Sequence, residues 1–112
     1  MGRTGFAAVV GLVLSISGGD ARADCYDVFG CSERDRFRAT DLRSGPTCEF
    51  LWTMRNSIYR QRGYCFATPR GVDTFGNEGC RYRDIARVPL NATERANAAT
   101  ILRVEREKGC SG

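Results

Sequence analysis

The chain carries, from Thr47 to Phe66, the stretch TCEFLWTMRNSIYRQRGYCF, and this stretch contains its first well-marked helix. Thr47 is a favourable N-cap, and Gly63 can adopt the left-handed conformation that ends a helix, so we expect a helix over about Cys48–Arg62. Arg55 falls within the apolar face of that helix, and a charge placed there needs a partner because an unpaired buried ion is costly. The residues expected to face inward recur at helical spacing: Leu51, Trp52, Ile58 and Tyr59.

A second long helix is expected near the end of the sequence. Asn91 and Glu94 have the three-residue spacing of a capping box, Leu90 precedes the cap and can staple it, and Gly109 can stop the helix. Its inward face is predicted from the same helical spacing: Ala98, Ile101, Leu102 and Glu105.

Glu105 is a charged residue on an apolar face, as Arg55 is on the first helix. We therefore predict that Arg55 and Glu105 form an ion pair across the two packed helices, with Asn56 or Asn97 supplying further hydrogen bonds. The alternative is that both charged side chains extend to solvent from the edges of their faces.

Between these helices a shorter one is expected. Thr68 is a suitable N-cap and Pro69 suits the first helical position, where its missing N–H costs nothing. Gly76 and Asn77 would end this helix. Its apolar edge is predicted to consist of Val72 and Phe75.

The remaining segments lack a clear period. Residues 24–46 contain a short extended candidate at Tyr26–Phe29, followed by mixed charges that indicate a solvated surface. Residues 81–88 are expected to form an irregular connection with Tyr82 and Ile85 as packing points. The predicted fold class is therefore mainly α: a small disulfide-stapled domain with two principal helices, one short helix and an irregular N-terminal segment.

The cysteines all follow a segment, residues 1–23, with the features of a signal peptide: Arg3, the apolar run Phe6–Ile16 and the small-residue exit Ala21–Ala23. An even number of cysteines in a short exported chain predicts disulfides rather than metal sites or reactive thiols. No second apolar run is long enough to span a bilayer. We expect a periplasmic or secreted protein with a cysteine-containing segment at 24–46 and a helical domain at 47–112. The cysteines are Cys25, Cys31, Cys48, Cys65, Cys80 and Cys110.

Six cysteines allow fifteen connectivities, so the pairing is open at this point. The order of the elements favours one set. Cys65–Cys80 would clamp the short helix to the first long one, and Cys48–Cys110 would suit antiparallel packing of the two long helices. Cys25–Cys31 then remains as a small N-terminal loop.

Two groups of residues together resemble the YARHG domain family, over about Thr47–Cys110. In the naming pentapeptide, only Tyr59 and Gly63 are kept, and the family's usual Trp-Tyr pair is replaced by residues 76–80, as in a cysteine-rich branch. The resemblance implies a small extracytoplasmic bacterial domain, sometimes found beside peptidoglycan-associated modules, with no established chemistry. The residues that carry it are Trp52, Arg55, Asn56, Ile58, Tyr59, Gly63, Tyr64 and Phe66, then Leu90, Asn91, Glu94, Asn97, Ile101 and Glu105.

The composition excludes several classes of enzyme. The sequence contains no histidine, which removes serine triads, the usual cysteine–histidine pairs and histidine-ligated zinc. It also has no closely spaced cysteine couple of the kind that zinc or thiol chemistry uses. We expect no metal, no cofactor and no enzymatic activity. A small glycan hydrolase is a less favoured alternative that would use two of the carboxylates Glu49, Glu78 and Asp84.

The pattern of charged residues indicates which classes of partner the protein can bind. The formal net charge is +4 at pH 7, and the basic and acidic residues are interleaved, which argues against a nucleic-acid partner. All but one of the 17 basic residues are arginines, which suit carboxylates and phosphates but also internal ion pairs. We expect binding of a cell-envelope component, either peptidoglycan or another anionic polymer, or of an envelope protein. An exported protein-binding inhibitor or effector is the alternative. The candidate anion contacts are Arg60, Arg62, Arg70, Arg81 and Arg83.

Overall fold

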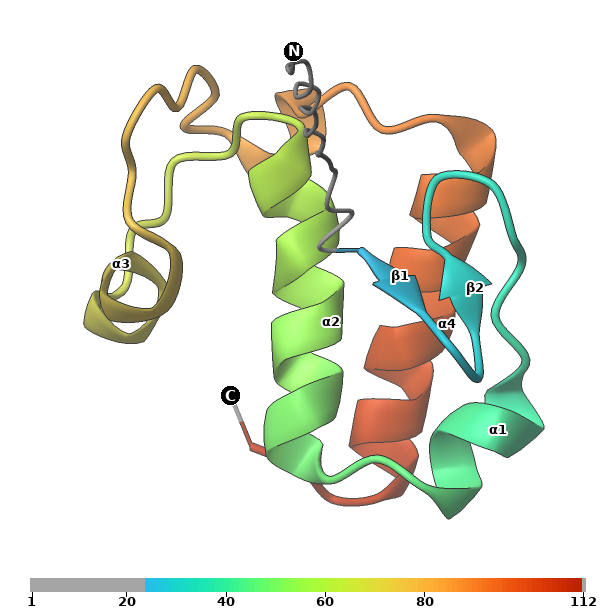
Figure 1. The fold of residues 1–112 in the computed structure, drawn as a ribbon. Helices are drawn as coiled ribbons and strands as arrows, with labels where there is room; N and C mark the ends of the chain where they lie inside the picture. The colour runs from blue at the N-terminus through green and yellow to red at the C-terminus, as the bar shows by residue number, and fades with distance from the viewer. Residues whose placement is uncertain (1–23, 112) are drawn as a thin grey trace, which may run out of the picture.

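Two long antiparallel helices form the centre of the fold in the computed structural model, α2 (Cys48–Gln61) and α4 (Ala92–Glu107), as Figure 1 shows. The structure describes residues 24–111, and the predicted signal peptide, residues 1–23, lies outside the described residues. The main hydrophobic core lies between these helices and the segments packed on them. Its most deeply buried members are Leu42, Leu51, Met54, Ile58, Ile101 and Val104.

Helix α2 begins and ends at the signals in its sequence. The Thr47 hydroxyl accepts a hydrogen bond from the Phe50 N–H at 3.1 Å, which satisfies one of the free donors of the first turn. After Gln61 the chain leaves the helix through Gly63, whose φ of 93° is a conformation that side chains with a Cβ rarely adopt. The helix is one residue shorter than expected, and its predicted inward residues lie in or against the core.

Helix α4 opens with the predicted capping box. Asn91 accepts from the Glu94 N–H at 2.8 Å, and Glu94 accepts from the Asn91 N–H at 2.8 Å. Where a hydrophobic staple would place an apolar residue, Arg95 instead donates to the Leu90 carbonyl at 2.8 Å. On the inward face Leu102 is only partly buried, whereas Val104 is fully buried.

The N-terminal segment is more regular than expected. Strands β1 (Cys25–Tyr26) and β2 (Gly30–Cys31) pair antiparallel, and helix α1 (Ala39–Ser44) follows. The arginines of this segment are exposed, as the mixed charges indicated, but the segment also has an inner side, where Phe37 and Leu42 are buried in the core. The sequence signal for α1 was weak because this six-residue helix presents only one large apolar side chain to its neighbours.

The short helix α3 (Pro69–Phe75) lies to one side of the two long helices (Figure 1). The Thr68 hydroxyl caps it by accepting from the Gly71 N–H at 3.1 Å. The ring of Phe75 stacks on Phe66 with 4.9 Å between the ring centres. The prediction for Val72 is wrong, because its side chain is exposed and the residue buried on this helix is Gly71.

The connection from α3 to α4 contains one 3-10 turn, η2 (Ile85–Arg87). Tyr82 packs against the core as expected. Ile85 does not, because the short turn directs its side chain outward and leaves it 45% exposed.

Disulfides join the predicted pairs Cys25–Cys31, Cys48–Cys110 and Cys65–Cys80. The second ties the start of α2 to the residues just after α4, and the third closes the loop that contains α3. The first joins two residues that face each other across the β1–β2 pair. Among the described helices, none combines the length and the apolar character that crossing a membrane requires.

Candidate anion-binding surface

The predicted partners Arg55 and Glu105 lie in contact between α2 and α4. The distance from Arg55 Nη2 to Glu105 Oε1 is 2.7 Å, and Arg55 Nε donates to the same oxygen at 2.9 Å. Their side chains are 15% and 6% exposed. A charge pair shielded to this degree holds two helices in one register, and it is not available to a ligand.

The two asparagines do not support this pair. Asn56 donates to the Trp52 carbonyl at 2.9 Å within its own helix. Asn97 is buried under the N-terminal segment, where it accepts from the Phe37 N–H at 2.8 Å and donates to the carbonyls of Ser32 and Asp35 at 3.0 and 2.9 Å. Asn97 therefore fastens residues 32–37 onto α4.

Two of the five candidate arginines are occupied by carboxylates of the same chain. Arg62 Nε contacts Glu94 Oε2 at 2.9 Å, and the Glu94 side chain is only 2% exposed. Arg70 contacts Glu49 at 2.8 Å, and its guanidinium lies 3.8 Å from the centre of the Trp52 ring. Arg62 and Arg70 therefore form internal ion pairs, the alternative role that the sequence left open for the arginines.

The other three candidates keep an uncompensated positive charge. Within the described part of the chain, Arg60 donates only to neutral carbonyls, those of Phe75 and Glu78, both at 3.4 Å. Arg81 and Arg83 are exposed, and their guanidinium groups have no hydrogen bond or ion pair with any residue that the structure describes. The Arg81 guanidinium lies 5.9 Å from the centre of the Tyr82 ring, within the range of a cation–π contact.

These arginines surround two neighbouring hollows. The first, here the Gly63 cavity, has a volume of about 350 Å³ and is lined in part by Arg60, Arg62 and Gly63. The second, here the Arg87 cavity, has a volume of about 490 Å³ and is lined by Arg83, Asp84 and Arg87 together with residues shared with the first. The shared residues are Arg81 and Tyr82.

Arg87 was missed by the sequence analysis. It ends the turn η2 and is exposed, and its guanidinium group has no hydrogen bond or ion pair with any described residue. The one acidic member of its cavity, Asp84, accepts from the Ala86 N–H at 3.0 Å and so holds that turn. The spacing of Arg81, Arg83 and Arg87 within one short segment was the available signal.

The backbone between the two cavities is held firmly. The Gly63 carbonyl accepts from the N–H groups of both Arg81 and Tyr82, at 2.7 and 3.0 Å, and Cys65 N–H donates to the Tyr82 carbonyl at 2.8 Å. The disulfide from Cys65 to Cys80 lies directly beside these bonds. The Arg81–Tyr82 segment is thus fixed to the end of α2, which reduces the ordering cost of binding there.

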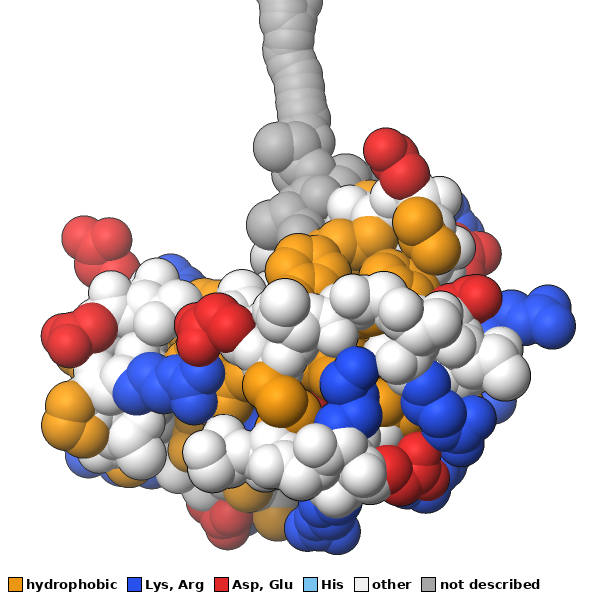
Figure 2. All heavy atoms as spheres, turned by 90° about the horizontal axis from the view of Figure 1, so that it is seen from below, with side chains coloured by type: hydrophobic (Ala, Val, Ile, Leu, Met, Phe, Trp, Pro, Cys, Tyr) orange, Lys and Arg blue, Asp and Glu red, His pale blue; other side chains and the backbone are white. Residues whose placement is uncertain are grey.

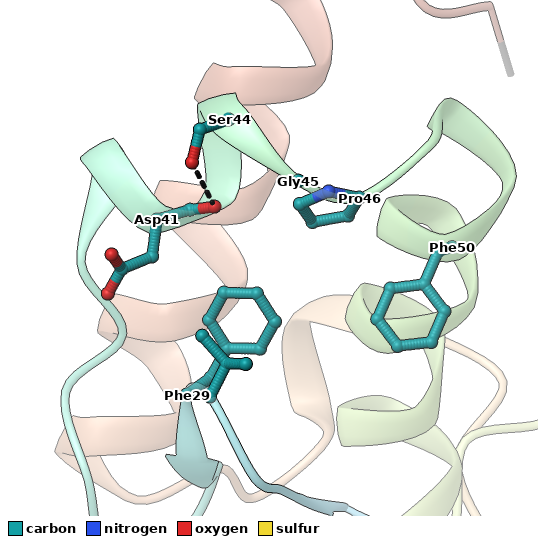
Figure 3. A pocket seen from close by; sticks show the side chains of 7 residues that line it. Phe29, Asp41, Ser44, Gly45, Pro46 and Phe50 are labelled. Atoms are coloured by element: carbon teal, nitrogen blue, oxygen red, sulfur yellow. Dashed lines mark hydrogen bonds between the residues drawn. The ribbon is translucent and has the colours of Figure 1, made fainter.

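A third hollow, of about 260 Å³, is apolar and lies at the opposite end of α2 (Figure 3). Phe29 and Phe50 face it from the β1–β2 turn and from α2, with Pro46 between α1 and α2. Val28 and Phe50 are 72% and 41% exposed. Figure 3 shows the Asp41 carboxylate turned away from the rings. Figure 2 shows hydrophobic side chains gathered on this face, with acidic and basic side chains interspersed around them.

Two groups with shifted pKa values also lie at that end of the molecule. Arg43 of α1 donates to Glu107 of α4 at 2.8 Å. This hydrogen bond is the main cause that lowers the pKa of Glu107, and it raises the pKa of Arg43. The pair fastens α1 to α4 and takes no part in either arginine-lined cavity.

The carboxylates considered for glycan hydrolysis lie on three different segments. Glu49 is in the first turn of α2 beside Arg70, Glu78 follows α3, and Asp84 caps η2. Only Asp84 lines either of the arginine-lined cavities. Hydrolysis needs two carboxyl groups across one bond, and neither arginine-lined cavity is lined by two of these three carboxylates.

The YARHG domain model matches residues 28–106 of the 112-residue chain. The chain belongs to the YARHG family. The match begins within the segment 24–46, and the structure packs that segment onto α4 of this YARHG domain through Asn97. No curated protein and no solved structure matches the chain.

Family membership explains little about a site, because the motif residues are largely structural. Arg55 pairs with Glu105, Glu94 pairs with Arg62 and caps α4, and Asn97 anchors the N-terminal segment. The YARHG domain is not a known enzymatic family. Arg81, Arg83 and Arg87, the exposed arginines of the Arg87 cavity, lie between the two groups of motif residues.

Proposed function

We propose that this YARHG domain is an exported, non-enzymatic module that binds an anionic component of the bacterial cell envelope, peptidoglycan or another anionic polymer. The main support is the group formed by Arg81, Arg83 and Arg87, three exposed arginines around one hollow that have no carboxylate partner among residues 24–111. The three disulfides fit an oxidising compartment, periplasmic or extracellular.

The chemistry of the surface favours a carboxylate or phosphate ligand. Arginine presents a planar fork of N–H donors that matches such groups, and its hydrogen bonds to them are stronger than those between neutral groups. Three guanidinium groups face one carboxylate, that of Asp84, in the Arg87 cavity. An anion bound there compensates the positive charge that Asp84 alone does not neutralise.

The test is sedimentation of the disulfide-bonded protein with purified cell wall. In the first variant Arg81, Arg83 and Arg87 are all replaced by Gln. The matched control replaces Arg36, Arg38 and Arg103, three exposed arginines outside the cavities, and so removes the same charge. We expect the bound fraction to fall steeply for the first variant and little for the control, and wild-type binding to weaken with salt. If both variants lose the same bound fraction, net charge alone explains the binding, and the proposal is contradicted.

The apolar hollow supports a second candidate, an exported inhibitor or effector that docks onto another protein. Exposed side chains such as Val28 and Phe50 beside a pocket are typical of protein contact surfaces. This candidate predicts that the wild-type protein does not sediment with wall. It also predicts that an envelope protein bound to the wild type is lost from a Val28→Asp variant and retained by the triple-arginine variant.

A further inference from the structure

We infer that the ligand is a linear polymer with an anionic group on each repeat, and that successive anionic groups occupy the Gly63 cavity and the Arg87 cavity at the same time. This inference rests on the proposed function, and it adds the class of ligand and the way the ligand lies on the surface. The relevant chemistry is a repeated carboxylate or phosphate.

The two cavities share part of their lining. Arg81 and Tyr82 line both hollows. A ligand that contacts these two residues therefore borders each cavity, and an extended ligand can enter both without a gap in its protein contacts.

Each cavity has arginine charges that are open to a ligand. In the Gly63 cavity Arg62 is already paired with Glu94, so the charges open to a ligand there are those of Arg60 and Arg81. In the Arg87 cavity they are those of Arg81, Arg83 and Arg87. A single small anion occupies one hollow and leaves without a partner the arginines that line only the other, either Arg60 or the pair Arg83 and Arg87. A chain with repeated negative charges provides partners for both groups.

The backbone segment between the two cavities is rigid. The Arg81–Tyr82 backbone is bonded to Gly63 and Cys65 and lies beside the Cys65–Cys80 disulfide. The spacing of the two cavities is therefore fixed before binding. When one repeat is bound, the next is presented to the second cavity at a high effective concentration, so affinity rises with ligand length.

The experiment measures the affinity of the disulfide-bonded protein for two ligand series by calorimetry. One consists of oligoglucuronates of increasing length, starting with the monosaccharide, and the other of glycerol phosphate oligomers. The two series distinguish carboxylate from phosphate. We expect affinity in at least one series to rise about 100-fold or more before it levels off. Uncharged glucose oligomers of matched length serve as the control and should not bind.

Two single substitutions test the contribution of each cavity separately. Arg60→Gln removes charge from the Gly63 cavity alone, and Arg87→Gln from the Arg87 cavity alone. Each should weaken binding of the longest oligomer about tenfold and flatten the dependence on length. Because Arg60 also holds two backbone carbonyls, Arg60→Lys is made as well, and it should retain most of the affinity if charge is what matters.

Three results would overturn the inference. The first is an affinity that does not change with ligand length. The second is a loss of affinity in only one of the variants Arg60→Gln and Arg87→Gln. The third is no binding in either series. None of them removes the proposed function as long as sedimentation with cell wall still depends on Arg81, Arg83 and Arg87. Conversely, the proposed function fails if that dependence is absent, whatever the oligomers do.

Discussion

Arg55 and Glu105 make the most consequential polar contact at the scale of single residues. We expect Arg55→Ala to lower the free energy of unfolding by roughly 3–5 kcal/mol, because it leaves the Glu105 carboxylate buried without its partner. Urea unfolding followed by Trp52 fluorescence measures this loss. Arg103→Ala, at an exposed position on α4, is the control and should change stability by about 0.5 kcal/mol or less.

A charge exchange tests whether these two side chains interact directly. The double variant Arg55→Glu with Glu105→Arg should be more stable than either of its single variants, since each single variant places two like charges together. A double variant no more stable than the single ones would count against the pair.

Tyr26 gives the fold a dependence on alkaline pH. Burial is the main cause that raises its pKa above 10.0, and the nearby Asp24 charge adds to the rise, while a hydrogen bond with Ser57 opposes it. Above pH 10 the folded chain thus holds this proton more tightly than the unfolded chain. The stabilisation is fully present below pH 10 and is lost as the pH rises through the pKa of the folded state.

Unfolding measured across the alkaline range checks this expectation. Stability should fall above pH 10 in the wild type, and Tyr26→Phe should show a shallower fall. Tyr64→Phe keeps Tyr26 and should behave as the wild type. Parallel curves for the wild type and Tyr26→Phe would show that another group is responsible.

At the scale of elements, helix α3 depends on the absence of one side chain. A Cβ at Gly71 would lie 2.7 Å from Cδ1 and 2.8 Å from Cβ of Phe66, and the Phe66 ring is stacked on Phe75. Although alanine favours a helix over glycine by about 1 kcal/mol, we expect Gly71→Ala to destabilise the protein by about 1–3 kcal/mol through overpacking.

Thermal unfolding of Gly71→Ala and of a control variant decides this prediction. The control is Gly45→Ala, where the nearest atom to a new Cβ, the Asp41 carbonyl oxygen, lies at an ordinary 3.9 Å. Gly45→Ala should leave the melting temperature almost unchanged. An equal effect of both substitutions would mean that the Phe66 contact relaxes without cost.

The elements differ in how well they could be predicted, and the reason is local. Helices α2 and α4 have caps and several apolar residues at helical spacing, so the sequence alone defines them. Strands of two residues carry no alternation, and α1 has only Leu42 as a deeply buried side chain. Such elements form because the rest of the molecule supplies their partners, as Asn97 does for the backbone near Phe37.

The same reasoning applies to the arginines of the site. Arg62 and Arg70 bind carboxylates 32 and 21 residues away in sequence, so no local pattern reveals that they are occupied. The pairing of Arg55 with Glu105 was foreseeable only because each charge interrupts an apolar face. Arg81 and Arg83 were identified from their charge alone, and the exposure of Arg87 depends on the turn that Asp84 caps.

At the scale of the whole molecule, the three disulfides should contribute unequally. They close separations of 62, 15 and 6 residues for Cys48–Cys110, Cys65–Cys80 and Cys25–Cys31. Loop-closure entropy in the unfolded chain predicts losses of about 4, 3 and 2 kcal/mol when each pair is replaced by alanines. Denaturant unfolding of the three double variants measures the order. The largest loss for the Cys25–Cys31 pair would show that contacts in the folded state, rather than loop length, dominate.

Cys48–Cys110 also encloses α3, both arginine-lined cavities and all of α4 within one covalent ring. A protease that nicks the backbone once inside this ring produces two fragments that stay joined through sulfur. The nicked protein would keep its mass apart from one added water, and its fragments would separate on a gel only after reduction. Clipping at the exposed segment around Arg83 could thus open the binding surface without releasing any part of the molecule.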